Sequence, residues 1–292
     1  MSLPKTIDLA AMKTGGFIKQ KEKDLFVIRL RTPVGKIDAG QLEVVSRVAR
    51  KYGNGNLHLT VRQGIEIQGI PFEQLQNARD ELEADGVRIG ACGPRFRVVT
   101  ACPGAEVCPN GLVDSAGLGL DADERFYGQS EGLELPHKFK VTFAGCLACC
   151  PKPQENDVGF HGMVDPELVA GDCNGCGVCE VTCKEGAIVM GDDDLPIKDA
   201  AKCIYCADCI KSCPTDAWVA KRTGLAAYAG GRWGRHPELG QKIGEFISPE
   251  EAMDVIAEVL RFYKEEGKRG ERLGVTIGRV GLDELKRRVN SD

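Results

Sequence analysis

The stretch LHLTVRQGIEIQGI, residues 57–70, predicts two short strands joined by a turn, because apolar and polar residues alternate in both of its halves. A further strand is predicted upstream at DLFVIRLRTP, residues 24–33, followed by an amphipathic helix over 37–53. A second helix is predicted over 71–86. This β-α-β-β-α order is that of a ferredoxin-like α+β sandwich. We therefore expect an α+β half-domain over residues 1–93.

The remainder of the chain keeps a mixed α/β pattern that one unusual segment interrupts. Strands and helices are predicted at RFRVVTAC (95–102), 108–128 (helix), KFKVTFAG (138–145), DVGFHGMV (157–164), GLAAYAGG (224–231) and 248–267 (helix). Residues 171–222 are instead rich in Cys and Gly and fall into two similar halves. We therefore expect a mixed α/β domain in two pieces, 94–170 and 223–292, with an insert at 171–222.

Composition indicates a globular protein without strong affinity for nucleic acid or lipid. The 292 residues are 42% hydrophobic and 28% charged, and the net charge is −5 with dispersed Lys and Arg, so we expect no nucleic-acid binding. No apolar run approaches the roughly 20 residues that span a bilayer, and no export signal is evident. We expect no membrane insertion and a cytoplasmic location, where the 14 cysteines would stay reduced and bind metal.

Two copies of the spacing C-x2-C-x2-C-x3-C lie in the insert and indicate iron–sulfur clusters. They are CNGCGVCEVTC, residues 173–183, and CIYCADCIKSCP, residues 203–214. Closely spaced thiolates wrap three corners of a cubane, and a distant cysteine supplies the fourth. Each cluster is therefore expected to draw on both copies: Cys173, Cys176, Cys179 with Cys213, and Cys203, Cys206, Cys209 with Cys183. Zinc knuckles or disulfides are the alternatives, although zinc sites seldom need this eight-cysteine register.

The insert resembles a bacterial two-[4Fe-4S] ferredoxin, with one departure. Lys184 follows Cys183 where that family usually has proline, whereas Pro214 follows Cys213 as expected. We expect a small change in the local turn with ligation intact. A ferredoxin carries electrons without using them, so the rest of the chain must supply their acceptor.

Four further cysteines can close a third cluster site. The segment ACPGAEVC holds Cys102 and Cys108 as C-x5-C, and GCLACC holds Cys146 and Cys150 as C-x3-C. Two such pairs supply the four thiolates of a cubane, and the alternative is that they are buried structural cysteines. The remaining cysteines, which fit no cluster spacing and are expected to be buried thiols, are Cys92 and Cys149.

These two motifs resemble the sirohaem [4Fe-4S] motif of the sulfite and nitrite reductases. The resemblance covers nearly the whole chain, because residues 57–70 are similar to that family's N-terminal half-domain and residues 245–289 to the end of its sirohaem domain. Dissimilatory-type members carry a ferredoxin inserted at the same place. The resemblance implies sirohaem and, with the insert, three [4Fe-4S] clusters, and it makes Cys150 the ligand that bridges the third cluster to the sirohaem iron.

The anion substrate of such an enzyme needs a cationic pocket, and the sequence offers candidates. Lys138 and Lys140 should point together from one strand face, because residues two apart on a strand share a face. The family's substrate-binding lysines stand in a matching LP-x-KFK context, and its arginine in the T-x-RQ context corresponds to Arg62. A further family arginine before the first cluster cysteine is matched less securely by Arg97. The alternative for the lysine pair is a solvated strand face.

Sirohaem carries eight carboxylates, so its cavity needs many basic donors. The candidates by neighbourhood are Arg31, Arg95, Arg97, Arg232 and Arg235. The segment GGRWGR, which holds the last two, could equally be a charged surface loop.

The resulting hypothesis is a sirohaem-dependent six-electron reduction of sulfite to sulfide, with electrons relayed through the inserted ferredoxin clusters. The alternatives are reduction of nitrite to ammonia, and an electron-transfer protein that binds sirohaem and clusters without turnover. The expected partners are the small anion and an electron-donor protein or subunit. Larger family members hold two copies of the half-domain and sirohaem-domain unit, so this single copy suggests a homodimer or pairing with a homologous subunit.

Overall fold

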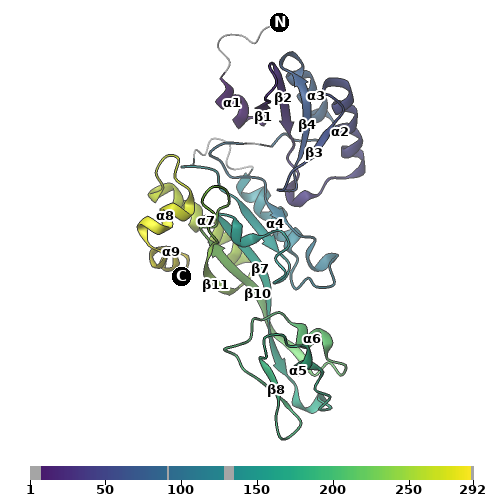
Figure 1. Ribbon diagram of the computed structural model, residues 1–292, viewed down its shortest axis with the longest axis vertical. Helices are drawn as coiled ribbons and strands as arrows, with labels where there is room; N and C mark the ends of the chain where they lie inside the picture. The colour runs from purple at the N-terminus through teal and green to yellow at the C-terminus, as the bar shows by residue number, and fades with distance from the viewer. Residues whose placement is uncertain (1–7, 91, 128–134, 291–292) are drawn as a thin grey trace.

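The computed structural model describes residues 8–90, 92–127 and 135–290 (Figure 1). Its N-terminal part is a four-stranded antiparallel sheet with strand order β1-β2-β4-β3. Its elements are α1 (Leu9–Thr14), β1 (Phe17–Lys19), β2 (Leu25–Arg29), α2 (Ala39–Tyr52), β3 (Leu57–Leu59), β4 (Ile65–Pro71) and α3 (Leu75–Ala84). The predicted β-α-β-β-α order is confirmed, and α1 and β1 precede it.

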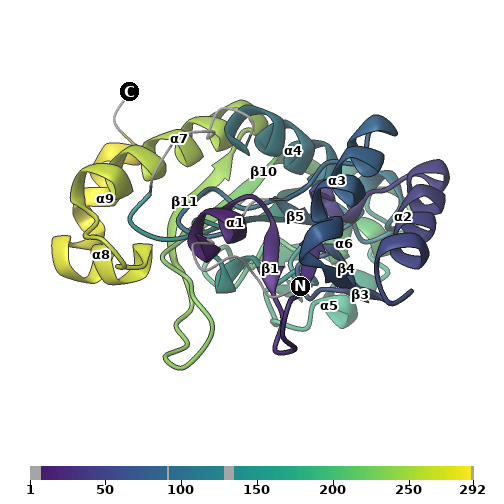
Figure 2. The ribbon, with the colours of Figure 1, turned by 90° about the horizontal axis from the view of Figure 1, so that it is seen from above.

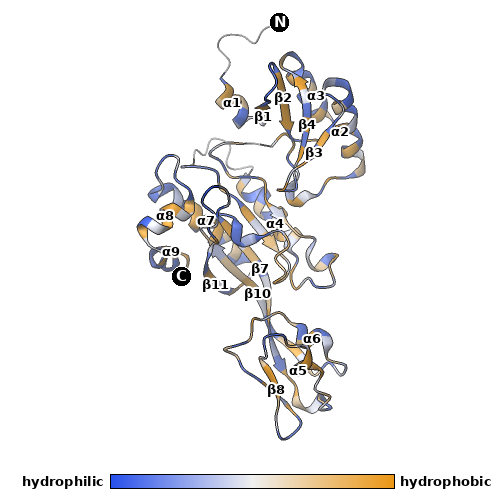
Figure 3. Cartoon of the chain, viewed as in Figure 1, coloured by the Kyte–Doolittle hydropathy of each residue, from blue (hydrophilic) through white to orange (hydrophobic). Residues whose placement is uncertain are grey.

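The helices of this half-domain form where local signals favour them. The Asp38 side chain accepts from the backbone N–H of Gln41, whose own side chain accepts from the Asp38 N–H, so that a capping box starts α2. Val45 and Val48 of α2 are fully buried in one core with strand residues such as Ile67. In Figure 3, β2 is largely orange, whereas α2 and α3 show both blue and orange residues, as amphipathic helices do.

A five-stranded mixed sheet forms the centre of the molecule. Its strands are β5 (Thr100–Ala101), β6 (Val141–Ala144), β7 (Val158–Leu168), β10 (Trp218–Ala229) and β11 (Gln241–Ile247), in the order β11-β10-β7-β6-β5. Strands β5, β6 and β7 run parallel, and β10 and β11 pair in antiparallel fashion. Phe143 and Phe160 stack in its core with ring centroids 4.8 Å apart. This sheet is the frame on which the predicted site segments lie.

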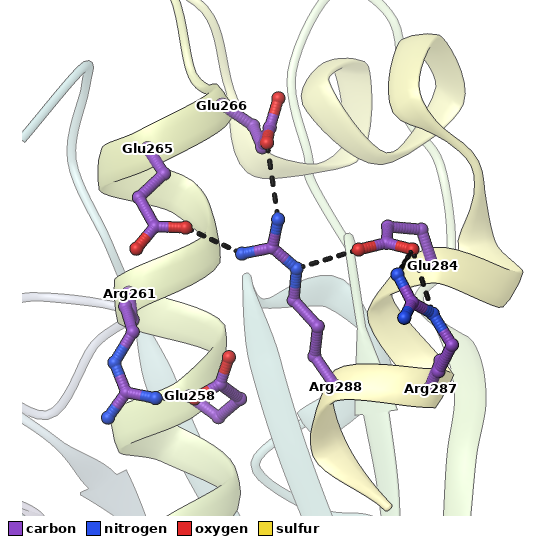
Figure 4. Close-up of polar contacts among 7 residues, drawn as sticks. All are labelled: Glu258, Arg261, Glu265, Glu266, Glu284, Arg287 and Arg288. Carbon is purple, nitrogen blue, oxygen red and sulfur yellow. Dashed lines mark hydrogen bonds and ion pairs between the residues drawn. The ribbon is translucent and has the colours of Figure 1, made fainter. Parts of the chain in front are cut away.

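Helices cover the central sheet and close its C-terminal end. They are α4 (Ser115–Ala122), α7 (Pro249–Glu266), α8 (Leu273–Val280) and α9 (Leu282–Val289). Helix α4 packs against β5 and β6, and α7 packs against β10. Seen from above, α8 and α9 lie at the opposite end of the molecule from α2 and α3 (Figure 2). Arg288 of α9 bonds to Glu265 and Glu266 of α7 and to Glu284 of its own helix (Figure 4).

The insert projects from the central sheet between β7 and β10 (Figure 1). It contains α5 (Val178–Thr182), β8 (Ile188–Met190), β9 (Pro196–Lys198) and α6 (Asp208–Ser212). Cys179, Ile188, Cys209 and Trp218 form a small core that is separate from the cores of the two larger parts. The residues before α5 and α6, Gly177 and Ala207, both have a left-handed backbone, as expected for two similar halves.

Four expectations for the central part are wrong in their bounds or incomplete. The strand predicted over 95–102 is shortened to Thr100–Ala101. The helix predicted over 108–128 begins at Ser115, because Leu112 and Val113 instead donate backbone bonds to the Gly145 carbonyl. The strand predicted over 138–145 begins at Val141, and Phe139 forms an isolated bridge to Phe96. Strand β11 was not expected, since QKIGEFI alternates weakly.

No helix in the three described ranges is both long enough and apolar enough to cross a bilayer.

Candidate functional site

The segment Lys138–Lys140 lies between two other stretches of backbone. Phe139 exchanges hydrogen bonds with Arg95 and Arg97, at 3.0 and 2.8 Å. The Lys140 carbonyl accepts from the Val158 N–H at 3.0 Å. Phe139 is fully buried, whereas both lysines are half-buried. The alternation thus places Lys138 and Lys140 on the side away from the core.

A buried ion pair lies directly behind Lys140. The Asp157 side chain is fully buried and accepts from the Lys140 backbone N–H at 3.0 Å. Arg272 donates to both Asp157 oxygens from Nη2, at 2.9 Å each, and from Nε at 3.2 Å. Arg272 precedes α8, so this contact joins the C-terminal helices to the segment that carries the lysines.

Three arginines line a cavity of about 220 Å³ between the half-domain and the central part. They are Arg29 of β2, Arg62 of the β3–β4 turn and Arg97. Arg62 donates to the Asn156 side chain at 2.7 Å and to the Val98 carbonyl at 2.9 Å, which fixes its direction. The cavity therefore brings Arg62 and Arg97 together, as expected, and adds Arg29.

The positive charges of this region act on one another. Burial, together with Arg62, lowers the pKa of Lys140 to about 8, and Asp157 opposes this shift. Burial, together with Arg272 and Arg97, also lowers the pKa of Lys138. The pKa of Arg62 falls to about 10, chiefly through burial and then through Arg97. A site that lowers the pKa of several cations at once favours an anion, which would relieve their repulsion.

His137 lies at the edge of the same region. Its Nδ1 accepts from the Lys138 backbone N–H at 2.7 Å, so the neutral ring carries its proton on Nε2. Burial and then Lys138 lower its pKa, and Arg272, Arg97 and Lys13 add to the effect. His137 therefore faces the cluster of cations as a neutral imidazole.

The third set of cysteines follows two neighbouring strands: Cys102 comes directly after β5, and Cys146 and Cys150 come shortly after β6. Cys102 Sγ accepts from the Gly145 N–H at 3.1 Å and lies 3.2 Å from the Ser115 hydroxyl. Cys149 has a left-handed backbone with φ of 48°, and its thiol accepts from the Gln154 amide at 3.5 Å. Burial raises its pKa, and the neighbouring Cys146, Cys150 and Cys102 add to the rise. Cys150 is exposed. Three of the four expected ligands thus lie within electrostatic range of Cys149, and Cys108 lies on the loop that bonds to Gly145.

The eight cysteines of the insert line two separate cavities. One cavity is lined by a set that includes Cys173, Cys176, Cys179 and Cys213. The other, of about 480 Å³, is lined by a set that includes Cys183, Cys203, Cys206 and Cys209. Each set takes three residues from one repeat and one from the other, as the spacing predicted. Among the described residues, no three or more Cys, His, Asp or Glu side chains lie close enough together to hold a single metal ion. The thiols of the insert line the walls of the two cavities instead.

The larger cavity also reaches the third set. Its wall includes Cys146, Leu147 and Ala148, together with Asn110 from the loop after Cys108. The backbone N–H of Val164 donates to the Tyr205 carbonyl at 3.0 Å, and the Tyr205 ring meets Phe246 edge-on. These contacts hold the Cys203 loop against the central sheet.

The remaining arginine candidates lie elsewhere. Arg31 donates from Nε to Asp123 at 3.0 Å and stacks on Tyr127, in a second cavity. Arg232 pairs with Glu238 at 3.1 Å within an exposed loop, and Arg235 of that loop is exposed. Arg95 contributes backbone bonds beside Phe139. The structure thus does not bring Arg31, Arg232 or Arg235 to the cavity of Arg62 and Arg97.

Three residues of the site were missed from the sequence. Arg29 shares a strand face with Arg31, so alternation could have found it. Asp157 and Arg272 are 115 residues apart and carry no local motif. Cys92, expected as a simple buried thiol, accepts from Arg29 at 2.8 Å and from Arg97 at 3.4 Å.

The chain matches two protein-family models. Residues 92–292 match the nitrite and sulphite reductase 4Fe-4S domain, and residues 18–85 match the nitrite/sulfite reductase ferredoxin-like half domain. Together these matches account for both larger parts of the fold.

Individual relatives agree with the family models. The chain is 31% identical to a coenzyme F420-dependent sulfite reductase of Methanocaldococcus jannaschii, over 93% of this chain and 44% of that protein. It is 25% identical to an assimilatory-type sulfite reductase of Nitratidesulfovibrio vulgaris, over 94% of this chain and 96% of that one. The chain thus spans less than half of the first relative and nearly all of the second. The crystal structure of dissimilatory sulfite reductase I has the same fold, with a TM-score of 0.76 at 21% identity over 92% of this chain and 69% of that one.

Proposed function

Because this chain belongs to the nitrite and sulphite reductase family, we propose that it reduces sulfite to sulfide with sirohaem and a coupled [4Fe-4S] cluster. The observation that carries the proposal is that Arg62 and Arg97 line one cavity, and that, in addition to burial, Arg62 lowers the pKa of Lys140 while Arg97 lowers that of Lys138. When bound, sirohaem and the clusters supply the electrons and an iron that takes the anion. The residues of the chain bind, orient and protonate that anion.

The donor set fits this chemistry. Sulfite is a small oxyanion whose oxygens leave as water, so its site needs cations that both hold charge and deliver protons. Lys140 has a pKa near 8, which makes it a charged donor at neutral pH that can release a proton at modest cost. Arg62 and Arg97 cannot serve as acids so readily, and we assign them to anion binding and orientation.

The cysteines fit three clusters. We assign Cys102, Cys108, Cys146 and Cys150 to the cluster beside the sirohaem, with Cys150 as the bridging ligand. Two more clusters would be held in the insert, one by the Cys173 set (Cys173, Cys176, Cys179 and Cys213) and one by the Cys203 set (Cys203, Cys206, Cys209 and Cys183). Because the Cys203 set shares a cavity wall with Cys146 and the Cys173 set does not, the first lies on the inner side of the insert and the second on the outer side. This order supports entry of electrons at the Cys173 side.

A sirohaem cavity and partners complete the proposal. Arg29 lines the cavity of Arg62 and Arg97, where it also pairs with Glu66, and it joins Arg95 as a candidate for the sirohaem carboxylates. Arg31 pairs with Asp123 outside this cavity, and Arg232 and Arg235 lie on an exposed loop. An electron-donor protein or subunit must supply the insert. The single half-domain supports a homodimer or a pairing with a homologous subunit.

The test begins with anaerobically purified protein. Sirohaem bands and about 13 iron atoms per chain, from three cubanes and one haem iron, are expected. Sulfite-dependent oxidation of a reduced artificial donor should follow, and the Lys140→Met variant should lose it while keeping its spectrum. Lys221→Met, which removes an exposed lysine of β10, is the matched control. Iron near eight atoms without a tetrapyrrole band would leave a ferredoxin and refute the proposal.

Nitrite is the second candidate substrate, because the family that the chain matches reduces either anion. The ratio of sulfite to nitrite turnover with the same artificial donor distinguishes the two. A protein that shows the sirohaem spectrum and oxidises donor with neither anion would instead be an electron-transfer protein.

A further inference from the structure

The Asp157 carboxylate is buried immediately before β7 and lies close to Lys140 of the proposed anion pocket. Burying a carboxylate costs several kcal/mol unless it is paired and hydrogen-bonded. Here Arg272 offsets its charge through three contacts of 2.9 to 3.2 Å. The remaining acceptor capacity goes to the Lys140 N–H. The ion pair is therefore hydrogen-bonded to the backbone of Lys140, which we propose binds the substrate.

The contacts of Lys140 leave its backbone little freedom. Its N–H is held by Asp157 Oδ2 and its carbonyl by the Val158 N–H, both at 3.0 Å. Asp157 and Val158 are consecutive, so one short segment of the chain forms hydrogen bonds with both the N–H and the carbonyl of Lys140. These two hydrogen bonds fix the backbone of Lys140, and a fixed backbone limits the directions that its side chain can take.

The same pair lies within electrostatic reach of the pocket. The charged groups that face Lys140 are Arg62, Asp157, Arg272 and Lys138, and Asp157 is the anion among them. Lys138 is faced by Arg272, Arg97, Asp157 and Lys13, with His137 beside it. Without Asp157, several cations would crowd Lys140 without compensation.

We infer that Asp157 and Arg272 form a positioning pair, which fixes the backbone of Lys140 and balances the charge around its ammonium group. This inference rests on the proposed function only in calling Lys140 a substrate residue. The pair touches neither the anion nor the reacting atoms, and it acts through Lys140. It would make the C-terminal segment around Arg272 part of the pocket, although that segment lies far from every motif in the sequence.

The experiment titrates Lys140 directly in the holoprotein. Acetic anhydride acetylates neutral amines, so the labelling of Lys138 and Lys140 against pH, followed by peptide mass spectrometry, reports each pKa without turnover. The variants are Asp157→Asn, the double variant Asp157→Asn with Arg272→Met, and Arg272→Lys. Asp165→Asn is the matched control, because Asp165 lies on β7, which Asp157 directly precedes, and pairs with Lys198 at 2.8 Å at the end next to the insert.

The signs follow from the charges. Asp157→Asn removes the anion that favours charged Lys140, so its midpoint should fall by about one unit below the native value near 8. The double variant also removes the repulsion of Arg272, and the midpoint should return to within about half a unit of the native one. Arg272→Lys keeps the charge and should leave the midpoint unchanged, as should Asp165→Asn. A midpoint that does not move in Asp157→Asn, or that moves equally in Asp165→Asn, would overturn the inference.

The KM for nitrite provides a second readout. Nitrite does not titrate in the alkaline range, so a change in its binding reports on the protein. In the double variant Arg272 no longer holds the side chain at position 157 against the Lys140 backbone, and the KM should rise about tenfold, which corresponds to about 1.4 kcal/mol. An unchanged KM would contradict the positioning role even if Asp157→Asn alone does not fold. A native protein that titrates as expected but takes up no sirohaem would refute the proposed function and leave the pair intact.

Discussion

Lys211 donates a hydrogen bond from Nζ to the backbone carbonyl of Asn110, 3.2 Å away, and so joins the insert to the loop that follows Cys108. Lys211 stands between Cys209 and Cys213 and also lines the cavity that Cys146 shares. One exposed side chain therefore links the loops of two proposed cluster sites. The insert is attached to the central sheet mainly through β7 and β10, so such a contact can restrict its orientation.

Replacing Lys211 by Met should slow turnover that depends on electrons entering through the insert. The contact is exposed and worth at most about 1 kcal/mol, so the decrease should be no more than about fivefold. Steady-state rates with a ferredoxin-type donor measure it, at unchanged iron content. Lys202→Met, which removes another exposed lysine of the insert, should have no effect, and an equal decrease in both variants would contradict the role of this contact.

Anion affinity should fall on the alkaline side of pH 8. Lys140 is charged below its pKa of about 8 and neutral above it, so binding of the anion weakens as pH rises through that value. The Lys140→Arg variant keeps a charge to much higher pH, so its loss of anion affinity should begin at a higher pH. The KM for nitrite as a function of pH is the measurement. If the KM for nitrite rose at the same pH in both proteins, a group other than Lys140 would be responsible for the pH dependence.

Cys149 and Cys150 should differ sharply when each is replaced by Ser. Cys149 is held by Gln154 and has a raised pKa, as suits a thiol that stays protonated, whereas exposed Cys150 is the proposed bridging ligand. Cys150→Ser should lose the sirohaem bands and about five iron atoms per chain, four from the cubane and one from the sirohaem, and Cys149→Ser should retain all of them. Absorption spectra and iron counts decide, and the reverse pattern would show that the two assignments are exchanged.

The network around Arg288 should contribute modestly to stability. Arg288 is bonded to Glu265 at 2.6 Å, to Glu284 at 2.9 Å and to Glu266 at 3.2 Å (Figure 4). Arg288→Met should lower the Tm by about 2 °C at low salt and by less at high salt, because salt screens partly exposed pairs. Calorimetry measures the change. Arg261→Met, which removes a pair within a single helix, is the control and should have the smaller effect.

Much of the fold could be predicted because its signals are local. Helix α2 begins at a capping box within four residues, and the core positions of β2 and β4 show in their alternation. The prediction of a helix start at residue 108 was wrong, because the N–H groups of Leu112 and Val113 donate to the carbonyl of Gly145, which is distant in the chain. Strand β11 was missed because its pairing with β10 includes register shifts that local periodicity does not reveal.

The cysteine repeats, the alternation of Lys138 and Lys140, and the family were predictable, because they depend on residues close together along the chain. Long-range packing established that Arg29 joins Arg62 and Arg97, and that the Cys203 set, rather than the Cys173 set, adjoins Cys146. It also decided that Arg272 neutralises Asp157 across 115 residues. A buried charge must find its partner wherever the packing places one, and spacing along the chain carries no record of that choice.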